Sequence, residues 1–166
     1  MKKLLSLTAA MLAALTVLSS SANAHEYKTG DLTVMHPWAR ATAKSAKTGA
    51  AYFIMMNAGT IADKLIDVRS DVALKTQIHL SSMTNGVMKM KHVDGVSIPP
   101  NGNAELKPGG YHIMFKGLKA PFQANRTFPL TLVFENNGAV TVNVKVEKSP
   151  TMKNMDHTMD HKTNKP

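Results

Sequence analysis

The feature that most constrains the fold is a series of nine short runs between residues 31 and 147 that are rich in branched and aromatic side chains. Each run is bounded by Gly, Asn, Asp or Pro, which predicts β-strands joined by turns, and no long helical period is present. The runs cover residues 32–41, 50–59, 64–70, 75–82, 86–93, 103–108, 111–118, 129–136 and 139–147. This spacing predicts an all-β fold, either an antiparallel sandwich or a Greek-key barrel.

Individual residues refine this picture. In the last run, valines at even positions from 140 to 146 alternate with polar residues, and Asn136-Asn137-Gly138 before it predicts a hairpin turn. Pro37 lies inside the first run, so we expect that strand to lie at a sheet edge or to be interrupted there. Met55 and Met56 belong to an apolar run and are expected in the core.

The first 24 residues have the pattern of a secretion signal. Lys2 and Lys3 form a positive start, residues 4–18 are apolar, and Ala22-Asn23-Ala24 is a small-residue cleavage site. The apolar run is too short for a membrane span. We therefore expect a periplasmic chain of 142 residues that begins at His25 and has no transmembrane segment, and the lack of a Cys at the cleavage site argues against a lipid anchor.

Composition limits how this exported chain is held together and what it binds. The sequence contains no Cys, so no disulfides are available and a hydrophobic core must stabilise the fold. About 140 residues suffice for one such domain, which we place at residues 25–148 and expect to be a monomer. The net charge of +9 is spread over many lysines with acids between them and no interleaved aromatics, which favours a solvated surface over nucleic-acid binding.

Residues 79–114 gather three histidines and four methionines around turn residues. In an extended strand, His112 and Met114 share one face, whereas Ile113 and Phe115 share the other, which is the natural core face. Pro108-Gly109-Gly110 predicts a turn that sets where this strand begins.

A second strand carries the same pattern. Met88 and Met90 fall on one face of the run GVMKM, with Lys89 and Lys91 opposite them. Imidazole with thioether, and without any thiol, favours Cu(I), because the sulfur is soft and neither ligand must lose a proton if the imidazole is neutral. Zinc more usually recruits Cys or carboxylate, and hard cations recruit oxygen. The chemistry of this stretch therefore predicts a copper site.

Residues 149–166 differ in composition from the rest of the chain. They contain no large apolar residue other than Met, so they cannot bury a core, and we expect a disordered tail. The tail repeats Met-Asp-His with a Thr spacer, and such short tracts can hold metal loosely. The candidate secondary metal ligands are Met152, Met155, His157, Met159 and His161. A merely solubilising tail with chance repeats is the alternative.

The central stretch resembles the PCu(A)C family of periplasmic copper chaperones, whose motif is H-x10-M-x21-H-x-M. His79, Met90, His112 and Met114 match every spacing of that motif, and the resemblance extends over about residues 30–147. It implies a cupredoxin-like β-sandwich that holds one Cu(I) through these four residues. It also implies delivery of copper to the dinuclear copper centre of cytochrome c oxidase subunit II, alone or with a thiol-bearing copper chaperone.

Similar C-terminal extensions in that family bind further copper, sometimes as Cu(II), which the resemblance suggests for the tail. Among residues outside the motif, His92 follows Met90 on the same strand face and is a candidate substitute ligand, and Met83 and Met88 flank the site. The expected function is binding and exchange of copper rather than catalysis. Periplasmic copper sequestration is the alternative, and a copper monooxygenase that uses His25 as an N-terminal ligand is the only enzymatic hypothesis.

Overall fold

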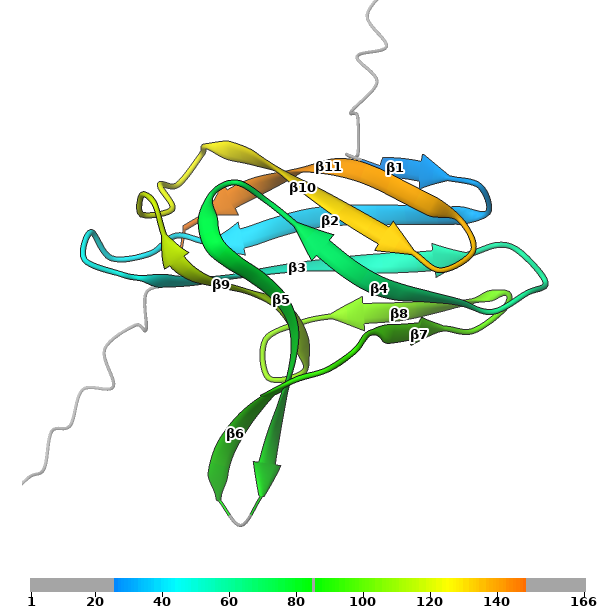
Figure 1. Ribbon diagram of the computed structural model, residues 1–166, viewed down its shortest axis with the longest axis horizontal. Helices are drawn as coiled ribbons and strands as arrows, with labels where there is room; N and C mark the ends of the chain where they lie inside the picture. The colour runs from blue at the N-terminus through cyan, green and yellow to red at the C-terminus, as the bar shows by residue number, and fades with distance from the viewer. Residues whose placement is uncertain (1–25, 85, 149–166) are drawn as a thin grey trace, which may run out of the picture.

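The computed structural model describes residues 26–84 and 86–148, and every regular element in these residues is a β-strand (Figure 1). The eleven strands are β1 (Glu26–Thr29), β2 (Leu32–Arg40), β3 (Thr48–Asn57), β4 (Asp63–Arg69), β5 (Ala73–Thr84), β6 (Val87–His92), β7 (Val96–Ile98), β8 (Gly102–Leu106), β9 (Tyr111–Leu118), β10 (Thr127–Phe134) and β11 (Gly138–Glu147). The all-β prediction is confirmed. A search of these residues for a helix long and apolar enough to cross a membrane finds none.

All nine predicted runs are strands, and the structure adds β1 and β7. Both additions are very short, with four residues in β1 and three in β7. The strands are linked by hydrogen bonds in the order β6-β5-β9-β3-β2-β11-β10-β4-β7, with β1 beside β2 and β8 beside β3. Every pairing is antiparallel except that of β11 with β2, so the antiparallel prediction holds for all but one strand pair.

The prediction that the first strand lies at a sheet edge or is interrupted at Pro37 is confirmed by its second alternative, because β2 lies inside the sheet and is interrupted there. Residues 32–35 pair with β1 and residues 38–40 pair with β11, so β2 changes its neighbour at His36-Pro37. The register with β3 shifts between Met35 and Trp38, and His36 has a φ of 48°. Proline is tolerated here because this bulge needs no ladder hydrogen bond from its nitrogen.

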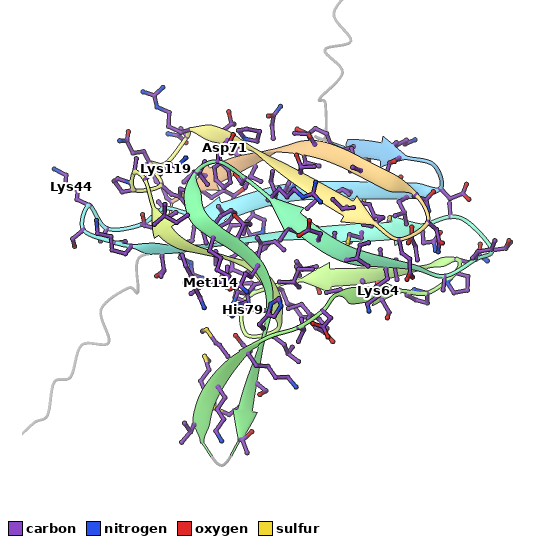
Figure 2. The ribbon with its side chains drawn as sticks, in the orientation of Figure 1. Lys44, Lys64, Asp71, His79, Met114 and Lys119 are labelled. Carbon is purple, nitrogen blue, oxygen red and sulfur yellow. The ribbon has the colours of Figure 1, made fainter. Side chains whose placement is uncertain are left out.

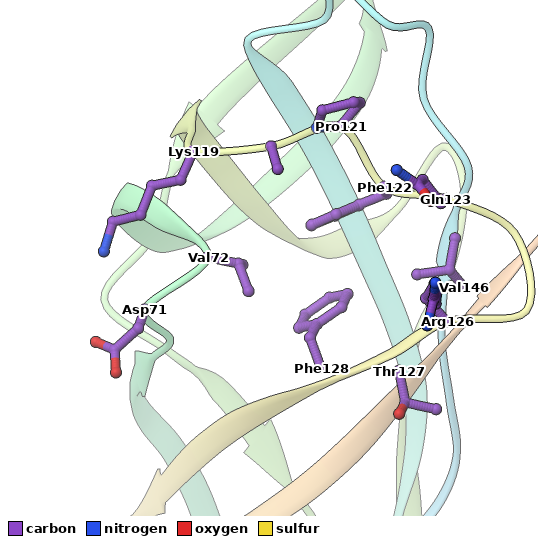
Figure 3. Close-up of a pocket in the computed structure, with 11 residues that line it drawn as sticks. Asp71, Val72, Lys119, Pro121, Phe122, Gln123, Arg126, Thr127, Phe128 and Val146 are labelled. Carbon is purple, nitrogen blue, oxygen red and sulfur yellow. The ribbon is translucent and has the colours of Figure 1, made fainter.

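The core lies between the curled faces of this sheet. Phe115, Phe122 and Phe128 form an aromatic cluster at one end, in which Phe122 and Phe128 stack with ring centroids 4.6 Å apart. Next to this cluster is a pocket of about 520 Å³, rimmed by charged residues such as Lys119 and Asp71 (Figure 3). The lining of this pocket contains no His or Met.

Strand alternation corrects one core prediction. Met55 is fully buried, as expected, but Met56 is 45% exposed because consecutive residues of β3 face opposite sides of the sheet. The predicted hairpin at residues 136–138 is confirmed, because Phe134 pairs with Gly138 at the start of β11.

A buried carboxylate fixes this hairpin. The side chain of Asp63 accepts hydrogen bonds from the backbone N–H groups of Lys64, Asn136 and Asn137 and from Nδ2 of Asn137. Burial raises the pKa of Asp63, but these hydrogen bonds outweigh burial and hold the pKa below its usual value of 3.8. The ionised carboxylate therefore ties β4 to the β10–β11 turn.

Candidate metal centre

Strand register brings the three central histidines into one row. His79 of β5 lies directly opposite His112 of β9 and, on its other side, directly opposite His92 of β6. Residues that face each other across an antiparallel pair project from the same face of the sheet. The ring centroid of His79 is 5.9 Å from that of His112 and 6.0 Å from that of His92.

The methionines of the motif share this face. Met114 lies opposite Gln77 of β5, and Met90 lies opposite Ser81, two residues beyond His79. Ile113 and Phe115 are fully buried in the core, so the predicted core face of β9 is confirmed. Figure 2 shows His79 and Met114 where the β5–β6 hairpin leaves the body of the protein.

Imidazoles and thioethers differ in their exposure. His79 and His112 are 5% and 4% exposed, whereas Met90 is 55% exposed and every residue of β6 is exposed. Met83 and Met88 form an exposed cross-strand pair nearer the hairpin tip. The centre therefore has a buried nitrogen side and a sulfur side that faces solvent.

The turn before β9 orients the imidazole of His112. Nδ1 of His112 lies 3.0 Å from the carbonyl oxygen of Gly110, and this oxygen also accepts a hydrogen bond from the N–H of Ser81. Because a carbonyl oxygen only accepts, Nδ1 carries the proton and Nε2 of the neutral ring keeps a free lone pair. The predicted turn at residues 108–110, in which Gly109 has a φ of 82°, thus fixes which nitrogen can bind a metal.

His79 has a different environment. Neither of its ring nitrogens has a hydrogen-bond partner among residues 26–84 and 86–148, although both are buried. Burial lowers the pKa of His79 below its usual 6.5, and nearby positive charges, Lys116 foremost, lower it further. The imidazole is therefore neutral at pH 7, which is the state that a metal requires.

A pocket of about 420 Å³ opens on this centre and is lined by residues of β2, β3, β5, β6 and β9. Its lining includes Met88, Met90, His112 and Met114, whereas His79 is absent from it and lies beside His112. The remaining walls include Arg40, Ala50 and Tyr52, which sequence reasoning missed because spacing along the chain does not reveal that β3 pairs with β9.

The donor set decides which metals this centre suits. No three His, Asp or Glu side chains in the described part of the chain are grouped so that they could hold a metal ion. The thioethers of Met90 and Met114 lie on the same sheet face as the imidazoles, and thioether with imidazole is the donor set of Cu(I). The other predicted sites, namely residues 1–24, His25 and the tail candidates Met152, Met155, His157, Met159 and His161, lie outside the described residues and stay predictions.

Comparison with known proteins places this geometry in a family. Residues 32–146, almost the entire described domain, match the family model described as "Putative lipoprotein LpqE-like". The chain belongs to the LpqE-like family. This LpqE-like chain is also 34% identical over 116 residues to the uncharacterized protein RP573 of Rickettsia prowazekii (strain Madrid E), with 68% of the chain and 64% of that relative covered. The chain thus matches somewhat less than two thirds of that relative's length.

Solved structures agree with this assignment. The LpqE-like chain is similar to a copper-bound PCuAC domain from PmoF2, with 28% identity and a TM-score of 0.65 over 75% of this chain and 99% of that domain. It is likewise similar to the apo PCuAC domain from PmoF1, with 30% identity and a TM-score of 0.65 over 75% and 100%. The resemblance to the PCu(A)C family and the expected fold class are confirmed by these matches.

Proposed function

We propose that this protein is a copper metallochaperone whose folded domain holds one Cu(I) ion through His79, Met90, His112 and Met114. The observation that carries the proposal is the register of β5 with β6 and β9, which places two buried imidazoles and two thioethers on one sheet face. The likeness to a copper-bound PCuAC domain supports it independently.

The chain's own residues explain how such an ion is held. The Gly110 carbonyl orients His112 so that Nε2 is the nitrogen left for the metal, and burial together with nearby positive charges lowers the pKa of His79, so His79 need not release a proton near pH 7. Four neutral ligands leave the charge of Cu(I) unchanged and favour Cu(I) over Cu(II), because thioether sulfur is soft.

Exchange, rather than catalysis, follows from the exposure of the ligands. Met90 lies on an exposed strand, so an incoming ligand from an acceptor protein can replace its sulfur while both buried imidazoles still hold the ion. Stepwise replacement of this kind passes copper to the acceptor without releasing a free ion.

The acceptor we propose is the copper centre of cytochrome c oxidase subunit II or a thiol-bearing copper chaperone that serves it. Acceptor and donor would meet in the periplasm, since residues 1–24 have the pattern of a secretion signal. The family description as a lipoprotein is consistent with export.

Titration with Cu(I) against a competing chelator tests the binding site. The mature chain is compared with His112→Ala, Met114→Leu, the matched control Met56→Leu, and a variant in which all five tail candidates are alanine. One tight equivalent should survive in the control and in the tail variant and weaken at least tenfold in the two site variants, since even residues that only support metal ligands are worth about 10- to 100-fold in affinity.

Transfer is tested next with an apo copper domain of cytochrome c oxidase subunit II. Passage of one Cu(I) to that domain is the expected result. Tight binding that is lost with the tail substitutions, together with retention of several copper ions, would instead identify a sequestration protein.

A further inference from the structure

His92 is the one histidine of the central row that the proposed Cu(I) site does not use. It lies directly opposite His79 across the β5–β6 pair, as His112 does across the β5–β9 pair. The ring centroids of His79 and His92 are 6.0 Å apart, almost the same as the 5.9 Å between His79 and His112. Two imidazoles that bind one metal ion at about 2 Å from each nitrogen place their ring centres about 5 to 6 Å apart.

The imidazole of His92 is oriented as that of His112 is. Its Nδ1 lies 3.1 Å from the carbonyl oxygen of Ile78, so Nδ1 carries the proton and Nε2 has the free lone pair. The same carbonyl oxygen accepts the N–H of Val93 at 3.0 Å, which holds the end of β6 against β5. An outer hydrogen bond of this kind fixes tautomer and ring orientation in metal-binding histidines.

His79 lies between these two oriented imidazoles. Both of its nitrogens are buried and lack a hydrogen-bond partner in the described part of the chain. Buried polar atoms are rarely left unpaired, and an unpaired pair of ring nitrogens points to a ligand that the protein alone does not supply. His79 can pair with either neighbour, but not with both at once through the same nitrogen.

The surroundings of His92 differ from those of the thioether pocket. His92 lines a separate pocket of about 390 Å³ that contains no methionine and whose walls include Asp67, Asp94, Gln77 and Lys75. His79 does not line this pocket, so His92 is the member of the pair that faces it. No three of these His and Asp side chains are grouped to hold a metal by themselves within residues 26–84 and 86–148. Two imidazole nitrogens, with water completing the coordination on this exposed side, form the nitrogen and oxygen donor set that suits Cu(II).

We propose that His79 and His92 form a second copper position that takes Cu(II), beside the thioether position that takes Cu(I). This proposal rests on the proposed function, because the two positions share His79 and are therefore occupied in alternation. The domain then binds copper in either oxidation state, with His92 and water on one side of His79 and His112 with the methionines on the other.

The test uses the mature full-length chain in which His25, His157 and His161 are alanine, so that Cu(II) binding elsewhere is reduced. Cu(II) sulfate is titrated into this background protein, into its His92→Gln variant and into its His36→Gln variant. His36 is the matched control, because it is an exposed histidine on β2 whose imidazole lies 3.5 Å from Glu147, away from the row. Binding is followed by electron paramagnetic resonance and by paramagnetic broadening of the histidine ring signals in NMR spectra.

The background protein should bind one Cu(II) with two nitrogen ligands and broaden the ring signals of His79 and His92. His92→Gln should weaken Cu(II) binding at least tenfold and change the spectrum, whereas His36→Gln should change neither. Unchanged Cu(II) binding in His92→Gln would overturn the proposal, as would the absence of Cu(II) binding in the background protein. An equal loss in His112→Gln would also overturn it, because the ion would then lie in the thioether position.

Cu(I) titration of the same variants separates this proposal from the proposed function. His92→Gln should leave Cu(I) affinity within about twofold of the background, and a tenfold loss would make His92 a Cu(I) ligand and refute the two-position scheme. Failure of the background protein to bind Cu(I) at all would refute the proposed function, whatever the Cu(II) result.

Discussion

Replacement of the buried imidazole of His79 by leucine should make the metal-free protein more stable. Most substitutions at a site that is 95% buried destabilise a protein, so the sign of this expectation is unusual. The reason is that both ring nitrogens of His79 lack partners within the described residues, and leucine of similar volume buries no polar atom.

The magnitude follows from these two nitrogens. A buried donor or acceptor without a partner costs roughly 1–3 kcal/mol, and a neutral imidazole has one of each. Leucine would pack against the rings of His92 and His112, and this imperfect fit offsets part of the gain, by up to about 1.5 kcal/mol. The two groups together cost at least about 2 kcal/mol, so after this offset we expect the free energy of unfolding to increase by at least about 0.5 kcal/mol. Each kcal/mol raises Tm by roughly 4 °C in a domain of this size.

Thermal and urea unfolding of the metal-free proteins, monitored by circular dichroism in the presence of a chelator, measure this difference. His92→Leu is the matched control on the same sheet face, and because its ring is exposed we expect no gain in stability from it. Added Cu(I) should raise the Tm of the unsubstituted protein and of the control, since a ligand that binds only the folded state stabilises it, but should leave His79→Leu unchanged.

The opposite sign would refute the reasoning. If metal-free His79→Leu is less stable than the unsubstituted protein by 1 kcal/mol or more, the nitrogens of His79 are already satisfied without metal. The argument that His79 is kept unpaired for a ligand would then fail, and with it one support for the second copper position.

Three further predictions concern pH and packing. The pKa of His79 is lower in the folded protein than in the unfolded chain, so the unfolded chain binds a proton at higher pH. The free energy of unfolding of the metal-free protein should therefore decrease as pH falls below about 6.5. Urea unfolding at pH 7.5 and pH 5 should show a smaller decrease in His79→Leu. Asp63→Asn should lower the free energy of unfolding, measured with urea, by about 2 kcal/mol at pH 7, because a charged acceptor of several N–H groups is lost. Since the pKa of Asp63 is lowered in the folded protein, the stability difference between the variant and the unsubstituted protein should shrink as pH falls through that pKa, below 3.8. A stability difference that does not change with pH would contradict this. Gly95→Ala should destabilise the protein by at least about 1 kcal/mol and so lower its Tm. Gly95 has a φ of 155°, and a methyl group there would meet the carbonyl oxygen of Leu65. An unchanged Tm would contradict this expectation.

Alternation along the chain made most of the fold predictable. It identified nine strands and correctly assigned the two faces of β9, because the period of two is a local property of an extended chain. It did not predict that β2 pairs in parallel with β11, since that neighbour is about a hundred residues distant in sequence. The same limit explains why the sequence left two alternatives at Pro37, because the change of partner that interrupts β2 there depends on distant strands.

The site was predictable to a similar degree. The spacing of His79, Met90, His112 and Met114 brought these residues to attention, and strand register places them on one face. The sequence did not reveal that His92 and His112 occupy equivalent positions on either side of His79. This arrangement depends on two strand pairings and on two backbone carbonyls that fix the ring tautomers. Burial of His79 without partners is likewise a tertiary property that no spacing reveals.

The buried imidazoles and the exposed thioethers determine the order in which Cu(I) would lose its ligands during transfer to an acceptor. A partner can approach Met90 and, further out, the Met83–Met88 pair, because β6 is bound only along its β5 side and every residue on it is exposed. The imidazoles of His79 and His112 are almost fully buried, so a partner that approaches the thioether position along β6 meets Met90 first. Cu(I) should therefore leave the thioether position by loss of a thioether first and an imidazole last. Met90→Leu would then speed release to an acceptor, whereas a substitution of His112 would weaken loading at least tenfold.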